Sequence, residues 1–272
     1  MCEVLAVSRS GYYRWRKAEG GGGGGAAAHE LDALIAKAFE DSRQTYGSPR
    51  LTLALRRQGH AVSESTVARR MRVLGLRPGT KKRFVRTTRS GHDHPVAPNL
   101  LDRNFTAAAP NEKWVSDLTY FAVDHRWAYL TTIIDLFDRR IVAWVVSDTM
   151  RAEATTIAAL QKAVRHHRPP AGLLFHSDRG VQYARGAFRE LLGAHAMVQS
   201  MSRKGDCYDN AVAESGFKTI KTECLHRYTF DTLEQARWVL FDYIDGWYNT
   251  LRIHTSLGGL SPDQLRQQLN AA

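Results

Sequence analysis

Three acidic residues that lie far apart in the sequence are the strongest candidates for chemistry: Asp117, Asp178 and Glu214. Asp117 lies inside the apolar segment Trp-Val-Ser-Asp-Leu-Thr-Tyr, where a charged side chain is costly unless it is paired or bound to a cation. Asp178 follows a short apolar run, and Glu214 lies on a stretch with helical character. Three carboxylates without a histidine or cysteine ligand pattern favour a hard, oxygen-preferring ion such as Mg²⁺ or Mn²⁺.

Positive charge accompanies the third acid. A polar loop with a glycine precedes a helix that Asp209 or Asn210 can cap at its N-terminus. On this helix Glu214, Lys218 and Lys221 are spaced i, i+4 and i+7, so that they share one face. An isolated Glu–Lys pair of this kind is more often an ordinary solvated pair. The two upstream aspartates are what favour a functional interpretation.

Other acids compete for a place in such a site. Asp135 and Asp138 end a neighbouring apolar stretch, but Asp138 is followed by two arginines and is typical of an internally paired turn. Glu223 lies on roughly the reverse side of the helix from Glu214. The remaining rivals, which we interpret as turn and cap residues, are Asp206 and Asp209.

The hydrophobic pattern beyond residue 110 predicts the strands and helices that must position the three acids. Alternating and β-branched segments predict a three-stranded meander, and helical and short strand-like segments then alternate. The order βββ, α, β, α, β, α predicts an α/β fold, a ribonuclease-H-like mixed sheet with flanking helices. In that fold the three acids converge at one edge. The predicted strands are 113–123, 127–137, 141–147, 172–176 and 196–200, and the predicted helices are 151–166, 186–195, one containing Glu214, and 231–248.

A smaller all-α region precedes this core. Hydrophobic spacing and the signals Ser48-Pro49, Gly59 and Gly75 predict three short helices between His29 and about residue 76. Three short helices resemble a helix-turn-helix module on a phosphate backbone, although a basic bundle that contacts protein remains an alternative. The arginines of the third helix, which would face DNA, are Arg69, Arg70 and Arg72.

The domain organisation follows from composition. Residues 1–28 form an N-terminal arm that ends in a glycine run, 29–78 the helical region, 79–110 a basic extended linker, and 111–272 the core. Residues 1–100 hold 18 lysines and arginines against 8 aspartates and glutamates, whereas residues 101–272 hold 20 against 19. This asymmetry indicates a polyanion-binding region attached to a domain with its own chemistry.

The same composition excludes several classes of protein. The three cysteines lack metal-site or disulfide spacing, and no apolar run is long enough to cross a bilayer. The N-terminus carries no basic segment ahead of its short apolar run, so a cytoplasmic protein is expected.

The motifs taken in order resemble the insertion-sequence transposases of the IS-three family, the catalytic product of the second reading frame, within the DDE transposase and retroviral integrase superfamily. Thirty-five residues separate Asp178 from Glu214, the spacing that names the acidic triad of that family. The matching residues span nearly the whole chain: Tyr12-Tyr13-x-Trp15, Tyr46 to Arg50, Trp114-x-x-Asp117 to Tyr120, His176 to Tyr183, Ser200 to Gly205, Asp209 to Ser215, Lys218-x-x-Lys221-x-Glu223, Tyr248-Asn249, Arg252-x-His254-x-Ser256-Leu257 and Ser261-Pro262.

The resemblance implies a mechanism. Asp117, Asp178 and Glu214 would bind two divalent ions, Mg²⁺ or Mn²⁺, that serve nicking at the end of the element and then strand transfer by the freed 3′-OH. Lys218 and Lys221 would hold phosphates, and Asn210 and Arg203 would contact DNA or brace the loop. Four further residues could act near the metals or could serve only the structure, and the two roles are equally expected: His176, Gln182, Arg252 and His254.

The resemblance also implies partners: double-stranded DNA, further copies of the chain on that DNA, and an upstream-frame protein that carries the main sequence reader. One departure is Gly216, at a position where the family usually has an aromatic residue. A glycine within a helix costs about 1 kcal/mol relative to alanine, so a softer helix is expected.

Two other functions compete with a transposase. A ribonuclease-H-like nuclease or resolvase would cut DNA without joining it, and a repressor derived from a transposon would bind DNA without cleaving it. The complete set of acids and lysines favours an enzyme over the repressor.

Overall fold

The computed structural model describes residues 8–20, 22–79 and 95–271. The chain divides into two compact units, residues 1–79 and residues 80–272, and each is described by itself. None of the helices in these ranges is both long and apolar enough to cross a membrane.

The first unit is all-α. Its elements are α1 (Arg9–Gly20), α2 (Gly22–Asp41), α3 (Ser48–Arg57) and α4 (Glu64–Val73). The last three form a small bundle around buried aliphatic residues that include Ile35 of α2, Leu55 of α3 and Val67 of α4. Pro49 lies in the first turn of α3 as predicted, but the cap of that helix is Gly47 and not Ser48. At the start of α4 the Ser63 hydroxyl accepts a hydrogen bond from the Thr66 amide, as predicted.

The glycine run differs from the expected linker. Gly20 ends α1 and residues 22–25 form the first turn of α2, so the described glycines are helical. Ala26, Ala27 and Ala28 follow directly, and alanine is the best helix former. Adding a turn to an existing helix costs far less than nucleating a new one, which accounts for the extension into the glycines.

The second unit is built on a five-stranded mixed sheet with the order β3-β2-β1-β4-β5. The antiparallel meander comprises β1 (Lys113–Val123), β2 (Arg126–Asp135) and β3 (Ile141–Ser147), and two strands parallel to β1 follow, β4 (Leu174–Ser177) and β5 (Val198–Met201). The predicted ribonuclease-H-like arrangement is confirmed, with strand bounds close to those expected.

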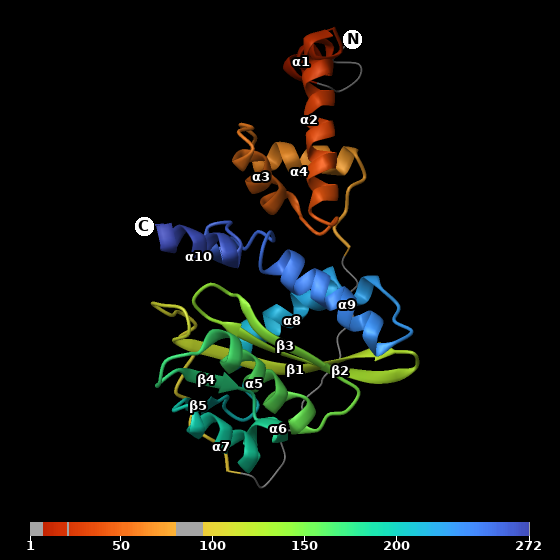
Figure 1. The fold of residues 1–272 in the computed structure, drawn as a ribbon. Helices are drawn as coiled ribbons and strands as arrows, with labels where there is room; N and C mark the ends of the chain where they lie inside the picture. The colour runs from red at the N-terminus through yellow and green to blue at the C-terminus, as the bar shows by residue number, and fades with distance from the viewer. Residues whose placement is uncertain (1–7, 21, 80–94, 272) are drawn as a thin grey trace. The chain divides into compact units, whose positions relative to one another are not determined.

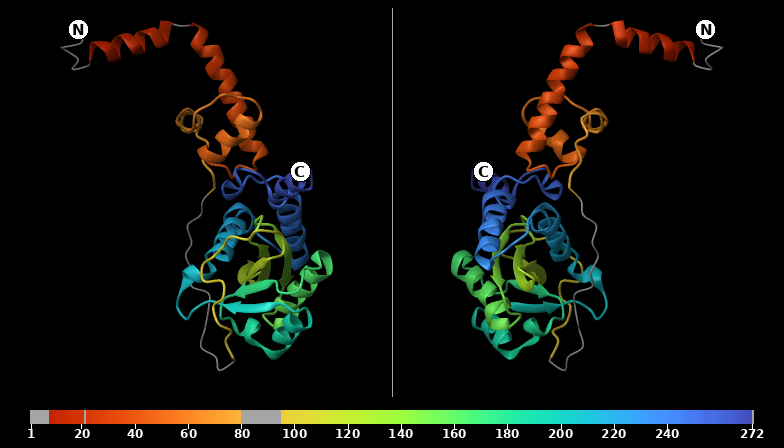
Figure 2. Two further views of the ribbon diagram at one scale, coloured as in Figure 1. Left: turned by 90° about the vertical axis from the view of Figure 1, so that its left-hand side faces the viewer. Right: turned by 90° about the vertical axis from the view of Figure 1, so that its right-hand side faces the viewer.

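Helices cover both faces of this sheet (Figure 1). Ile133 of β2 belongs to an apolar cluster with α5 (Thr156–His167) and α7 (Gly186–Ala194). Its neighbour Ile134 points to the opposite face, where Gly216 of α8 (Ala211–Glu223) lies against it. Side views separate the green-to-teal helices from the blue ones across the sheet (Figure 2). The short helix α6 (Val181–Ala184), which the sequence did not predict, joins β4 to α7.

The C-terminal helices close the α8 face. Helix α9 (Leu233–Tyr243) continues into a π-helical turn, Ile244–Tyr248, and α10 (Pro262–Ala271) ends the described chain. The residues Ser261-Pro262-Asp263-Gln264 predict a capping box at the start of α10, and it is confirmed, because Ser261 and Gln264 exchange side chain–backbone hydrogen bonds at 3.0 and 3.2 Å. Asp231 and Glu234 predict a similar box at the start of α9, but this prediction is wrong by one residue.

The cap of α9 is Thr232. Its hydroxyl accepts a hydrogen bond from the Gln235 amide at 3.1 Å, and the Gln235 side chain accepts one from the Asp231 amide at 2.8 Å. A threonine hydroxyl reaches the amide three residues on as well as an aspartate does, so composition alone does not decide between adjacent candidates.

The predicted linker, 79–110, is only partly tested, since residues 80–94 lie outside the described residues. Its second half is anchored to the core. Leu101 is buried, and the amides of Leu100 and Leu101 donate to the Ser200 hydroxyl at 2.9 and 3.1 Å. Arg103 donates to Asp209 at 3.1 Å. The buried Leu101 supplies the packing that a free connector lacks, whereas the Leu100 side chain is exposed.

Candidate active site

The register of β1 and β4 brings the two aspartates together. These strands are parallel, and Ser116 is paired with Ser177. Asp117 and Asp178 are therefore the next residues on neighbouring strands, at the point where the pairing of β1 with β4 ends. Adjacent strands lie roughly 5 Å apart, so the two carboxylates meet at the end of the ladder.

Glu214 approaches the same point from the first turn of α8. The core side of this helix, which includes Ala213, Phe217 and Ile220, packs on the sheet. Glu214 is exposed, about a quarter-turn around the helix from these residues. The Glu214 side chain therefore lies near the strand ends without being buried against them.

The protonation equilibria show that the three acids interact. The pKa of Asp117 is raised well above its usual value, first by burial and then by the negative charges of Asp178 and Glu214. The pKa of Glu214 is raised by partial burial and by Asp178. The Leu118 amide, which donates to Asp117 Oδ1 at 2.8 Å, only partly offsets the rise at Asp117. Like charges held this close favour a bound cation.

The donor set fits a hard divalent cation, because all three side chains offer carboxylate oxygens. Within the described ranges no three acidic, histidine or cysteine side chains are already gathered as a ready-made metal site. The mutual pKa effects nevertheless link all three acids.

Lys221 lies close enough to the acids for its charge to interact with Asp117. Burial lowers the pKa of its ammonium group, and the charge of Asp117 opposes that shift. Its Nζ lies 5.8 Å from the centroid of the Tyr120 ring. Lys218, one turn closer to Glu214, is exposed. The structure thus places Lys221 beside the acids, and Lys218 on the solvent side of the same helix.

Arg203 lies in the loop before α8, and Asn210 is the N-cap of that helix. The Arg203 guanidinium donates to Asp209 at 2.9 and 3.0 Å, and its amide donates to the same carboxylate at 2.8 Å. These bonds hold the pKa of Asp209 well below its usual range. Asn210 is buried at the start of α8, and its side chain makes no capping hydrogen bond. Bracing of the loop, one of the two roles expected for Arg203, is therefore visible.

Below the acids lies a layer of buried polar side chains. The Tyr183 hydroxyl lies 2.8 Å from Ser116 Oγ, and burial followed by the charges of Asp117 and Asp178 raises its pKa well above the usual value. His176 lies between Ser200 and Ser202 at 2.8 and 3.2 Å. Sequence reasoning gave Tyr183 no role, although it belongs to the motif that carries Asp178.

The rival acids serve the architecture instead. Asp135 accepts hydrogen bonds from the amides of Asn111 and Phe137 at 2.8 and 3.0 Å, and both Asp135 and Asp138 pair with Arg266 of α10. Burial raises the pKa of Asp135 to about 6. Asp138 is therefore not only paired within its own turn, as the sequence had indicated.

Of the residues for which two roles were expected, two are tied into the core. Arg252 donates to both carboxylate oxygens of Glu223 at 2.7 Å, and both side chains are buried. His254 is buried against the Tyr248 ring, with the centroids 4.7 Å apart. Gln182 donates to the Met150 carbonyl at 3.5 Å. These contacts favour structural roles for Arg252 and His254.

The three arginines of α4 differ from one another. Arg69 and Arg72 are exposed and three residues apart, so they share a face. Arg70 instead forms a bidentate ion pair with Asp32 of α2. Arg70 thus holds two helices together, a contact that sequence spacing did not reveal.

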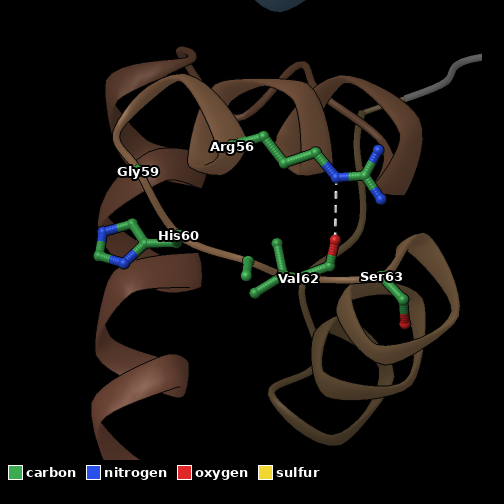
Figure 3. Close-up of a pocket in the computed structure, with 6 residues that line it drawn as sticks. Arg56, Gly59, His60, Val62 and Ser63 are labelled. Atoms are coloured by element: carbon green, nitrogen blue, oxygen red, sulfur yellow. Dashed lines mark hydrogen bonds between the residues drawn. The ribbon is translucent and has the colours of Figure 1, made fainter.

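The turn between α3 and α4 borders an open hollow of about 420 Å³. Arg56 donates through Nε to the Val62 carbonyl at 3.0 Å and fixes the turn, while the Ser63 side chain points away from this bond (Figure 3). The remaining residues that line the hollow are Gly59, His60 and Ala61. The hollow is lined by no acidic residue and belongs to the helical unit.

Known families and structures match separate parts of the chain. Residues 27–84 match the HTH-like domain family, and residues 107–207 and 214–269 match two integrase core domain families. Among solved structures, the HTLV-2 integrase catalytic core domain in complex with magnesium is 19% identical, with a TM-score of 0.46 over 58% of this chain and 97% of that one. The catalytic domain of Mos1 mariner transposase is 15% identical, with a TM-score of 0.43 over 50% and 71%.

A helix-turn-helix-like unit joined to an integrase core defines the class: a DNA-acting polynucleotidyl transferase of the DDE type. Curated relatives narrow this further. Transposase InsF for insertion sequence IS3A of Escherichia coli (strain K12) is 40% identical over 98% of this chain and 93% of that protein. The insertion element IS600 uncharacterized 31 kDa protein of Shigella sonnei is 42% identical over 98% of both. The chain belongs to the IS3 family of insertion-sequence transposases.

Proposed function

We propose that Asp117, Asp178 and Glu214 are the catalytic carboxylates of this DDE transposase, and that they act in both nicking and strand transfer. The observation that carries the proposal is the register of the parallel strands, in which Ser116 faces Ser177 and the two aspartates follow side by side. The raised pKa of Asp117, caused by burial and then by the other two acids, supports the inclusion of Glu214.

The reaction is a pair of substitutions at phosphorus. In the first, a water oxygen bonds to the phosphorus at the end of the element, the bond to the 3′ oxygen breaks, and a proton returns to that oxygen to give a free 3′-OH. In the second, this 3′-OH attacks a target phosphodiester and releases the target's own 3′ oxygen. Nucleophile and leaving group are oxygens in both steps, so one site can serve for both.

The three carboxylates would hold two divalent ions, which when bound supply a polarised nucleophile and neutralise charge on the leaving oxygen. The residues around the acids do the positioning. Lys221, beside Asp117, would hold a phosphate next to the scissile bond, and the exposed Lys218 would hold the next one. Arg203 has about half of its side chain exposed although it pairs with Asp209, so it can contact DNA while bracing the loop.

The helical unit would supply DNA contacts of its own. Arg69 and Arg72 are the exposed arginines of α4 and would contact the phosphate backbone, whereas Arg70 would act only through the packing of α4 on α2. Asn210 would position the loop and the DNA near α8. Copies of the chain would act together on the two ends of the element, with an upstream-frame protein or fusion partner as the main sequence reader.

The test is cleavage of a labelled duplex that carries the end of the element. Asp117→Asn, Asp178→Asn and Glu214→Gln are each expected to reduce Mg²⁺-dependent nicking by at least about a thousandfold, while a gel shift without metal stays unchanged. Glu190→Gln is the matched control, because Glu190 is an exposed glutamate on α7, across the sheet from α8. Wild-type-like nicking by a variant would remove that residue from the site.

A pre-nicked duplex with a free 3′-OH separates the transposase from the nuclease. The transposase is expected to join that end to a second duplex, and the joined strand is detected by its length. Cleavage without any joined product, under conditions where the wild-type protein nicks, would favour the resolvase-like alternative.

A further inference from the structure

An exposed aromatic pair lies on the β1–β2 hairpin. Trp127 keeps 57% of its surface exposed, although tryptophan is a largely apolar side chain. The Tyr120 ring packs against it, with the centroids 4.7 Å apart and the planes at 77°. In such an edge-to-face contact at least one indole face is left uncovered. The two strands extend toward this hairpin, coloured yellow-green at the end of the sheet opposite β5 (Figure 1).

This pair is connected to the acids through one cation. Lys221 lies 5.8 Å from the centre of the Tyr120 ring, and its ammonium interacts with the carboxylate of Asp117. Beyond Ser116 the described residues give β1 no strand partner on its β4 side, and α8, which carries Lys221, packs against β1. Lys221 therefore links the acids to the aromatic pair.

Those groups match one kind of ligand. A lysine and an exposed indole that both contact the Tyr120 ring offer a phosphate contact and a stacking face close together, the combination that single-stranded nucleic acid uses. A base inside a duplex has both faces covered by its neighbours, so only an unpaired or extruded base can stack on a protein ring.

We propose that Tyr120 and Trp127 form a stacking platform for an unpaired base close to the phosphodiester that is cut, with Lys221 on the adjacent phosphate. The proposal rests on the function proposed above and specifies the form of its substrate: a DNA end that is frayed over the last base pairs. The aromatic pair would hold the frayed base and keep the end open while the carboxylates face the backbone.

The experiment measures binding without divalent metal, so that chemistry is absent. Two duplexes carry the same sequence at the element's end, one fully paired and one with two mismatched terminal pairs. Trp127→Leu in the full chain is expected to weaken binding of the frayed duplex about tenfold and that of the paired duplex by less than about twofold. Trp127→Tyr retains an aromatic face and should restore most of the loss. Trp238→Leu, at an equally exposed tryptophan on α9, should change neither.

A direct readout accompanies the affinities. 2-Aminopurine at the frayed position is expected to be quenched on binding to the wild-type protein and to the Trp127→Tyr variant, but not to Trp127→Leu. Equal losses on both duplexes, or quenching that survives Trp127→Leu, would overturn the platform. A change in oligomeric state on Trp127→Leu, seen by light scattering, would also overturn it and assign the surface to a second copy of the chain. Each of these results leaves the cleavage tests of the acids untouched.

Discussion

Asp117 shows how the position of one carboxylate sets its chemistry. It lies on a strand that is buried on both sides up to Ser116 and that loses its β4 partner at the next residue. Desolvation raises its pKa, and the nearby Asp178 and Glu214 raise it further. Ionising a carboxyl with these neighbours costs free energy, and a bound divalent cation would offset that cost.

The raised pKa values predict how a metal affects stability. A carboxyl whose pKa is higher in the folded than in the unfolded protein loses its contribution to stability as the pH rises through the folded value. A cation that binds the ionised acids reverses this loss, so Mg²⁺ should raise the melting temperature more at about pH 8 than at about pH 5. At a hundred times its dissociation constant, the gain should be about 2.7 kcal/mol.

Calorimetry with and without Mg²⁺ across this pH range measures the effect. The Asp178→Asn variant should show little gain at any pH, and Glu190→Gln should behave like the wild-type protein. An Mg²⁺ gain that is independent of pH, or that persists in Asp178→Asn, would place the bound ion elsewhere.

At the scale of elements, a buried ion pair fixes the helix that carries the third acid. Glu223 ends α8, and both of its oxygens accept hydrogen bonds from Arg252. The Tyr243 hydroxyl of α9 donates to the same carboxylate at 2.9 Å. The far end of α8 is thus locked to the C-terminal segment, which fixes the helix axis and so the direction from which Glu214 approaches the strands.

Breaking this pair should unfold the protein more readily. Glu223→Gln leaves the Arg252 guanidinium buried beside a neutral partner, and such a loss costs about 3–5 kcal/mol. Urea unfolding followed by tryptophan fluorescence gives the difference. The control is Asp41→Asn, which removes an ion pair with Lys37. The side chains of Asp41 and Lys37 are 55% and 75% exposed, so this substitution should change the free energy of unfolding by no more than about 1 kcal/mol. Equal effects in the two variants would contradict a special role for the buried pair.

Substitutions of the α4 arginines should affect either DNA binding or stability, depending on the arginine. Arg69→Ala and Arg72→Ala should each lower the slope of log affinity against log salt by about 1 and leave unfolding unchanged, because exposed arginines contribute through phosphate contacts. Arg70→Ala should instead lower the melting temperature, because it removes the link to Asp32. Binding assays at several salt concentrations, together with thermal unfolding of the same variants, distinguish these outcomes. A salt slope that changes only in Arg70→Ala would reverse the assignment.

The elements themselves were largely predictable where hydrophobic periodicity is strong. The strands β1 and β3 have the expected bounds, because alternation and β-branched residues end at turn residues on both sides. Helix ends were less predictable. Asp209 looked like a cap for α8 but binds Arg203 and Arg103, and its partner Arg103 lies more than a hundred residues away in the sequence. Local patterns do not contain such contacts.

At the scale of the whole molecule, the two parts of the chain differ in composition and in net charge. The basic first part of the chain contains the residues that match an HTH-like domain, and the balanced part contains the acids. The family motifs predict the triad, which stays a proposal until the variants are measured. Spacing along the chain could not show that Lys221 would lie between Asp117 and an aromatic pair, because Trp127 joins that surface only through the pairing of β1 with β2.

The contact between Gly216 and Ile134 has a consequence for the descent of this chain. A Cβ at position 216 would come within 2.6 Å of the Ile134 Cδ1 atom, two residues from Glu214. The Cδ1 atom is the far end of a flexible side chain, so an alanine at 216 would require the Ile134 side chain to shift while the backbone of α8 stays in place. During descent the residues at 134 and 216 are therefore coupled, because the side chain at one position sets the space left at the other.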